Sequence, residues 1–125
     1  MAGCGQVKNM SYIHHYVNNL TIAEFTPEEV VLSTAQEFLQ MMMDAAADGI
    51  IVQQKNINEK FFDLQSGLAG EMLQKVINYR LRLAIVGDFS MYESKSLKAF
   101  IAESNRSNAI VFVNNVEEAV RRLSK

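Results

Sequence analysis

The sequence has few of the residues that crosslink or interrupt a fold. Its 125 residues include one cysteine, one proline and no tryptophan. A lone cysteine, Cys4, cannot form an internal disulfide, which excludes the small disulfide-rich folds and favours a reducing, cytoplasmic location. The two histidines, His14 and His15, are adjacent on an expected strand and point to opposite faces, so we expect neither a metal site nor a cofactor built on them.

Excess positive charge and long apolar runs are also missing. Twelve basic residues against fourteen acidic ones give a net charge of -2, without the basic excess that binds phosphate backbones, so nucleic acid is not an expected partner. No window approaches the roughly 20 apolar residues that cross a bilayer, so we expect no membrane partner. Residues 1–9 show no hydrophobic period and are expected to be a disordered tail before a single domain over residues 10–125.

The N-terminal part of that domain predicts a β-hairpin. Residues 12–17 alternate with the period of two that is typical of a strand, and residues 21–25 are a second extended stretch. The intervening Asn18-Asn19 pair tolerates the positive φ of a tight turn. After Pro27, residues 30–32 fit either a third strand or the approach to the first helix.

Helical and extended patterns alternate in the rest of the chain. Ser33 with Gln36 and Thr34 with Glu37 are overlapping capping-box frames, followed by an apolar helical stripe that we expect to end at Gly49. Three units follow, with strands at 50–52, 81–86 and 109–113 and helices at 67–79, 95–105 and 116–123. Nearly continuous apolar strands joined by helices predict an α/β fold, a mixed sheet with parallel central strands, an N-terminal hairpin and about four helices.

Function is expected where the parallel strands end and the helices begin. In the first such loop Ser66 stands before Gly67 and Gly70. Ser66 is placed to be the helix N-cap, and the two glycines leave the helix start open to an anion or to a phosphoryl group on Ser66. From the residues alone, a plain capping serine is the favoured interpretation, and a ligand or regulatory role is the alternative.

The second such loop, residues 87–94, holds Asp88 just past a strand end. A buried carboxylate there would have the raised pKa of a general base. However, no histidine lies nearby in sequence and Ser94 is explained as an N-cap, so we expect no catalytic residue. A magnesium site through the carboxylates of Asp63 and Asp88 stays open as an alternative.

Several of these segments resemble a known family. The order of elements, together with the segments Phe62-Asp63, Ser66-Gly67-Leu68, 81–87, Phe112-Val113 and Glu117-Glu118-Ala119, is similar to the STAS domain of bacterial anti-sigma factor antagonists. In that family the loop reads Asp-Ser-Ser-Gly-Leu, and phosphorylation of the first serine switches partner binding off. Here one residue is inserted, so Leu64 or Gln65 falls on the acceptor position and Ser66 matches the second serine.

At closer range the chain resembles an uncharacterised bacterial family of unknown function. The segments that carry this resemblance are Phe61-Phe62-Asp63-Leu64, Leu68-Ala69-Gly70-Glu71, Leu73-Gln74-Lys75, Asn78-Tyr79, 83–90 and Glu103-Ser104-Asn105. This second resemblance implies a fold and no activity.

The two loops and the STAS resemblance together predict a non-enzymatic signalling module that binds a regulatory protein partner. Its contact residues would be Phe62, Asp63, Gln65, Ser66, Gly67, Asp88 and Phe89, with Ser66 the candidate phosphorylation site. The phenylalanines would supply apolar area and the aspartates charge specificity. One alternative is a small-molecule or phosphate-ligand binding protein, or an enzyme, that uses the same loops; another is a homodimer.

Overall fold

The computed structural model describes residues 11–125, so the expected tail over residues 1–9 lies outside the described residues. Five strands form one sheet in the order β1-β2-β3-β4-β5. They are β1 (Tyr12–Val17), β2 (Leu20–Phe25), β3 (Gly49–Gln53), β4 (Leu83–Val86) and β5 (Ile110–Val113). β1 is antiparallel to β2, and all other neighbours are parallel. The mixed sheet with a hairpin and a parallel centre is confirmed.

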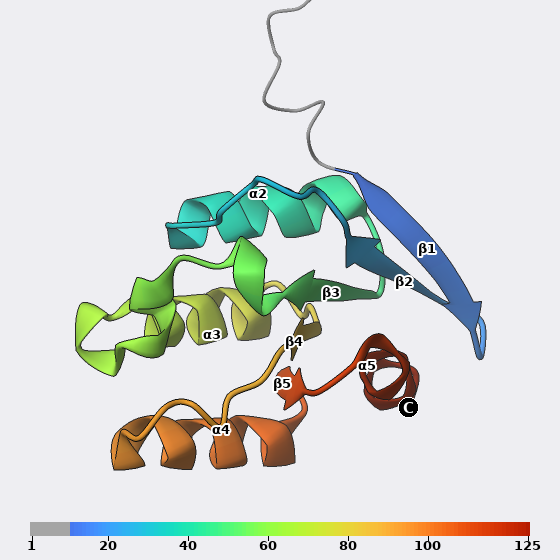
Figure 1. Ribbon diagram of the computed structural model, residues 1–125. Helices are drawn as coiled ribbons and strands as arrows, with labels where there is room; N and C mark the ends of the chain where they lie inside the picture. Colours follow the sequence, from blue (N-terminus) through green and yellow to red (C-terminus); the bar gives the residue numbers. More distant parts are fainter. Residues whose placement is uncertain (1–10) are drawn as a thin grey trace, which may run out of the picture.

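The described residues form four α-helices, which cover the two faces of the sheet unequally. They are α2 (Ala35–Ala45), α3 (Leu68–Asn78), α4 (Lys95–Ser107) and α5 (Val116–Leu123). The first three connect consecutive parallel strands, and crossovers of one hand place their helices on one face. α5 follows the last strand and lies on the opposite face (Figure 1).

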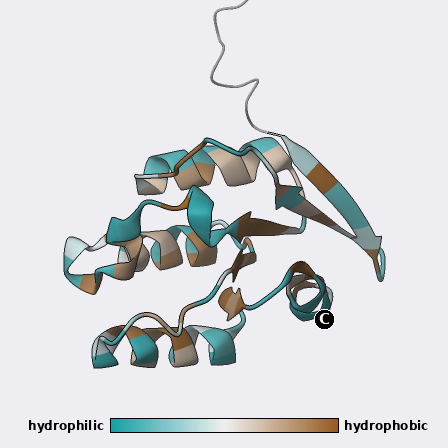
Figure 2. Ribbon diagram, viewed as in Figure 1, coloured by the Kyte–Doolittle hydropathy of each residue, from teal (hydrophilic) through white to brown (hydrophobic). Residues whose placement is uncertain are grey.

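Each central strand is buried on both faces because its side chains alternate between two apolar clusters. In β3, Ile50 and Val52 pack toward α2, α3 and α4, whereas Ile51 packs toward α5. Figure 2 shows these strands as hydrophobic ribbons between the helices. This double burial is the physical reason for the continuous apolar runs in the sequence.

The hairpin turn at Asn18 and Asn19 forms as expected. Asn18 and Asn19 have φ values of 54° and 66°, as a two-residue turn requires. The segment before the first helix does not become a full strand, because Leu32 makes a single parallel bridge with Ile57. Asn56 holds this segment by donating from its side chain to the carbonyl of Val30 at 2.9 Å.

The first helix begins as predicted by one of the two capping frames and ends earlier than expected. The Thr34 hydroxyl accepts from the Glu37 N–H at 3.1 Å. The helix ends at Ala45, and Ala46 takes the left-handed conformation with φ 49°. Gly49 is therefore not the helix stop. It opens β3, where an added Cβ would come within 3.2 Å of the Leu123 side chain.

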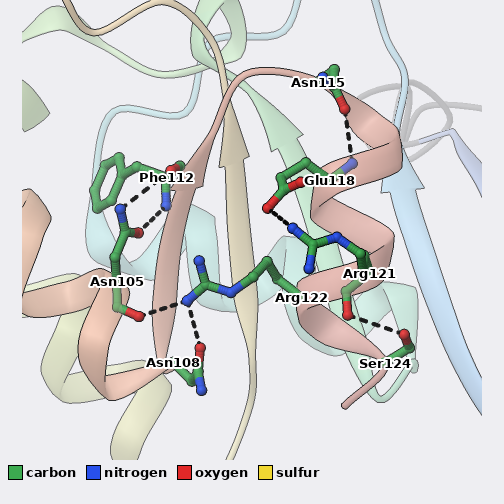
Figure 3. A network of polar contacts seen from close by, with 8 residues as sticks. All are labelled: Asn105, Asn108, Phe112, Asn115, Glu118, Arg121, Arg122 and Ser124. Carbon is green, nitrogen blue, oxygen red and sulfur yellow. Dashed lines mark hydrogen bonds and ion pairs between the residues drawn. The ribbon is translucent and has the colours of Figure 1, made fainter.

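A polar network fastens α5 to the rest of the fold (Figure 3). Arg122 donates to the carbonyl of Asn105 at 2.6 Å and to the side-chain oxygen of Asn108 at 2.7 Å. Arg82, just before β4, donates to the carbonyls of Arg122 and Leu123, both at 3.0 Å. A guanidinium on the last carbonyls of α5 satisfies acceptors that have no partner within the helix.

Candidate functional site

The two candidate loops lie at the carboxyl ends of β3 and β4 and lead into α3 and α4 (Figure 1). The first loop is ordered as three short 3-10 helices, η1 (Gln54–Asn56), η2 (Glu59–Phe62) and η3 (Leu64–Ser66). A hollow of about 380 Å³ has Asp63 and Gln65 on one side and Ser94 and Ser96 of the α4 start on the other. The first loop therefore lies beside the start of α4.

An aromatic cluster supports both loops from beneath. The Phe62 ring stacks on Tyr92 with centroids 4.9 Å apart, and lies 6.0 Å from the Phe89 ring. Phe89 in turn meets Phe112 of β5 edge to face at 5.3 Å. Phe62 is only 5% exposed, so it cannot offer apolar area to a partner as we expected. The reason is that the second loop folds over its ring.

A polar clasp built on Gln54 joins the loops above this cluster. Its side-chain oxygen accepts from the Asp88 N–H at 3.0 Å, and its side-chain nitrogen donates to the Tyr92 hydroxyl at 3.0 Å. The Tyr92 hydroxyl donates to Glu59 at 2.8 Å. Partial burial and this carboxylate raise the pKa of Tyr92 to about 12, so the phenol keeps its proton at neutral pH.

Gly87 permits this clasp to form. A Cβ at Gly87 would lie 2.3 Å from the side-chain oxygen of Gln54 and 2.6 Å from its Cβ. The sequence analysis did not select Gln54, Glu59 or Tyr92. The available signal was a glycine directly after an apolar strand, which indicates that another group approaches the backbone closely.

Ser66 is exposed, as a modification site must be, but it is not the N-cap of α3. Gly67 takes that position with φ 83° and offers no side chain to the helix amides. Ser66 instead ends η3, where its hydroxyl donates to the Lys60 carbonyl at 2.5 Å and accepts from the Leu68 N–H at 3.3 Å. An added Cβ at Gly67 or Gly70 would meet nothing within 4 Å, so the helix start is open.

The exposed aspartates serve their own loops. The Asp63 carboxylate accepts from the Gln65 N–H at 3.1 Å, and the Asp88 carboxylate accepts from the hydroxyl of Ser90 at 2.7 Å and from its N–H at 3.0 Å. The Ser90 donors lower the pKa of Asp88, which is the opposite of what a general base at neutral pH needs.

No group of three or more His, Cys, Asp or Glu side chains within residues 11–125 is arranged to hold a metal ion. The open magnesium alternative rested on the carboxylates of Asp63 and Asp88. Each of these carboxylates accepts a backbone N–H two residues further along its own loop. The geometry therefore offers no argument for that alternative.

A second hollow, of about 340 Å³, lies beside Ser66 on the side of α2. It is lined by residues 33–36 at the start of α2, by Ser66 and Leu68 at the start of α3, and by Lys60 and Glu71. Two helix starts and a lysine make this hollow favourable for an anion, and the Glu71 carboxylate offsets part of that effect.

Comparisons with known proteins give a family without a described activity. Among the described helices, none has the length and apolar content to span a bilayer. No curated protein and no solved structure matches the chain. A domain family of unknown function, DUF4180, matches residues 17–123, which is most of the sequence and includes both loops, and the chain therefore belongs to the DUF4180 family.

Proposed function

We propose that this domain is a non-enzymatic regulatory module that binds a protein partner through the loop surface formed by Asp63, Gln65, Ser66, Gly67 and Asp88, with Phe89 at its edge. The observation that carries the proposal is that these residues lie in two loops joined by packed rings, with Phe62 stacked on Tyr92 and tilted against Phe89. A surface that is already ordered loses little conformational entropy on binding. Its two carboxylates would give charge specificity for a partner with basic groups.

The resemblance to the STAS domain supports the same surface from an independent direction. In that family, the loop that corresponds to the one leading into α3 binds the partner and carries the regulatory serine. Ser66 is the serine that this chain offers there, with an exposed side chain. A phosphorylated Ser66 has no proton to donate to the Lys60 carbonyl, so modification would break that hydrogen bond and add negative charge to the surface.

A phosphate-bearing small molecule is the second candidate for the same region. The hollow of about 340 Å³ beside Ser66, with Lys60 and two helix starts, is the observation that favours it. Such a ligand would raise the unfolding temperature of the isolated domain, and the stabilisation would grow with the logarithm of the ligand concentration once that exceeds the dissociation constant. If the domain binds only a protein partner, phosphate compounds should not change the unfolding temperature of the isolated domain.

The test is capture of the partner with matched charge variants. Gln65→Lys places a positive charge in the centre of the loop surface without removing a side-chain hydrogen bond that the loop uses, because only its backbone N–H bonds Asp63. Gln74→Lys makes the same change on the exposed side of α3. We expect a protein from the native cells to co-purify with the unchanged chain and with Gln74→Lys, and to be lost with Gln65→Lys.

Each other outcome contradicts the proposal. Equal capture by both variants means that the partner uses another surface. A thermal shift with inorganic phosphate or a nucleotide, abolished by Lys60→Gln, supports the small ligand instead. Mass spectrometry of the purified chain reports whether Ser66 is modified. Repeating the capture after phosphatase treatment shows whether that modification weakens binding of the partner.

A further inference from the structure

The two edges of the sheet differ in how their outward backbone groups are bonded. β5 is one edge strand. The carbonyls of Ala109 and Val113 accept hydrogen bonds from the N–H groups of Leu83 in β4 and of Gly87 directly after it, so these two residues face β4. Phe112 therefore faces outward, and the side chain of Asn105 bonds both its N–H and its carbonyl. At Phe112 this edge is closed by the protein itself.

Within residues 11–125, the β1 edge is open at His14 and Tyr16 by comparison. The Ser11 carbonyl accepts from the Thr26 N–H at 2.9 Å, and in an antiparallel ladder every second residue faces the same neighbour. The N–H and carbonyl groups of His14 and Tyr16 therefore point away from β2. No residue in the range 11–125 bonds these outward groups of His14 and Tyr16.

β1 also has none of the features that protect edge strands from pairing. It pairs with β2 over six consecutive positions without a bulge, and its sequence YIHHYV contains no lysine and no proline. Ile13 is 54% exposed and Tyr16 is 77% exposed. Natural edge strands carry lysine, proline or a bulge because an open, flat, apolar edge pairs with another strand.

The edge is complementary to itself. A two-fold axis through His15, perpendicular to the sheet, places His14 of one copy opposite Tyr16 of the other, and such pairs exchange both of their backbone hydrogen bonds. The same register places Ile13 opposite Val17 of the second copy, on one face. Val17 lines a groove of about 530 Å³ between β1 and α5, in which Val116 and Val120 stand beside the charged Glu117 and Arg121. Each exposed isoleucine would lie at the mouth of the other copy's groove.

Charge also favours a second copy. β1 contains no aspartate, glutamate, lysine or arginine. The two His15 side chains that this register places opposite each other each lie 3.0 Å from the Glu24 carboxylate of their own chain, so any charge on these rings is paired within each copy and opposes an identical partner less. The exposed apolar contacts are reciprocal, as an isologous interface demands. The loops at the carboxyl ends of β3 and β4 are at a distance from this edge (Figure 1).

We propose that the β1 edge is the docking surface for a second copy of this chain, which pairs antiparallel to it and extends the sheet through both copies. The loop surface proposed to bind a regulatory partner stays accessible in this dimer. The two proposals are independent, since one concerns the edge of the sheet and the other concerns the ends of its strands.

Sedimentation equilibrium of the full chain over a range of concentrations tests the dimer, with His14→Pro as the variant. Proline lacks the outward N–H and is tolerated on an edge strand where that N–H faces solvent. His14→Thr is the matched control, because it changes the same side chain and keeps the N–H. We expect a dimer for the unchanged chain and for His14→Thr, and a mass lower by half for His14→Pro.

A second pair of variants keeps the test decisive if His14→Pro does not fold, as judged by circular dichroism. Ile13→Lys adds a charge to the edge, whereas Ile77→Lys makes the same change on α3 at a residue that is also 54% exposed. We expect only the first to dissociate the dimer. A chain that is monomeric at every concentration, or a dimer that neither His14→Pro nor Ile13→Lys weakens, overturns the proposal.

Hydrogen exchange separates a second copy from other occupants of the edge. We expect the amides of His14 and Tyr16 to exchange slowly in concentrated solution and quickly after dilution. Protection that dilution does not change means that the same chain covers its own edge. Protection that appears only after a different protein is added means that the edge serves another partner, and both results contradict the proposal.

Discussion

Asn105 bonds Phe112 in the manner of a neighbouring strand (Figure 3). Its side-chain oxygen accepts from the Phe112 N–H at 2.7 Å, and its side-chain nitrogen donates to the Phe112 carbonyl at 3.4 Å. The carbonyl of Asn105 accepts from Arg122 of α5. One residue near the end of α4 thus caps the β5 edge at Phe112 and binds the last helix.

Asn105→Ala should therefore destabilise the protein and expose the β5 edge. We expect the free energy of unfolding to fall by about 1 kcal/mol, the net value of a typical hydrogen bond, in urea unfolding followed by circular dichroism. The control is Asn78→Ala, at an exposed asparagine that ends α3. Light scattering should rise with Asn105→Ala alone. Equal losses of stability in the two variants would show that the Phe112 contact contributes nothing.

Two glycines predict opposite effects of the same substitution. Gly87→Ala forces Gln54 out of its position, since the new Cβ would lie 2.6 Å from the Gln54 Cβ, and overpacking of this kind costs roughly 1–3 kcal/mol. Gly70→Ala meets no atom within 4 Å and lies inside α3, where alanine is better than glycine by up to about 1 kcal/mol.

Thermal unfolding of the two variants checks this contrast directly. The midpoint should fall for Gly87→Ala and rise for Gly70→Ala. If Gly87→Ala leaves both the midpoint and the tyrosine fluorescence of the chain unchanged, the clasp made by Gln54 does not hold the two loops together.

The fold was predictable because its signals are local. Apolar runs marked each parallel strand, and the Thr34 to Glu37 frame marked the start of the first helix. The errors arose where a long-range contact decides the role of a residue. Gly49 was expected to end a helix, yet it opens β3, where a Cβ would come within 3.2 Å of the Leu123 side chain from the far end of the chain.

For the candidate site, the sequence indicated the two loops but not how they pack against each other. Strand ends identified both loops, but sequence could not show that Phe62 is covered by Tyr92, because stacking of these rings depends on how two separate loops meet. Gln54 was missed for the same reason, since its side-chain partners lie in the other loop. A glutamine in a loop carries no sequence pattern that distinguishes a clasp from a solvated side chain.

Ser66→Ala tests the structural role of the candidate phosphorylation site. The variant loses the hydrogen bonds of the hydroxyl with the Lys60 carbonyl and the Leu68 N–H, and we expect a loss of about 1 kcal/mol in urea unfolding. Ser96→Ala, at an exposed serine in the first turn of α4, is the control and should be neutral. If Ser66→Ala is also neutral and partner capture is abolished, the residue acts at the interface alone.

Tyr92→Phe should change how stability depends on alkaline pH. Burial, and then the hydrogen bond to Glu59, raise the pKa of Tyr92 from 10.0 to about 12 in the folded protein. The stabilisation from the neutral phenol is therefore fully present below pH 10 and is lost as the pH rises toward 12. Tyr12, whose pKa is also raised by burial and by Asp44, is the same in both proteins, so the difference between them isolates Tyr92.

At neutral pH we expect Tyr92→Phe to lower the free energy of unfolding by about 1 kcal/mol, because the bond to Glu59 is lost while the ring still stacks on Phe62. As the pH rises above 10, this deficit should shrink, since only the unchanged chain must keep the Tyr92 phenol protonated in order to stay folded. Urea unfolding at a series of pH values measures the difference. Parallel curves for the two proteins would show that the Tyr92 hydroxyl is not held against ionisation by the clasp.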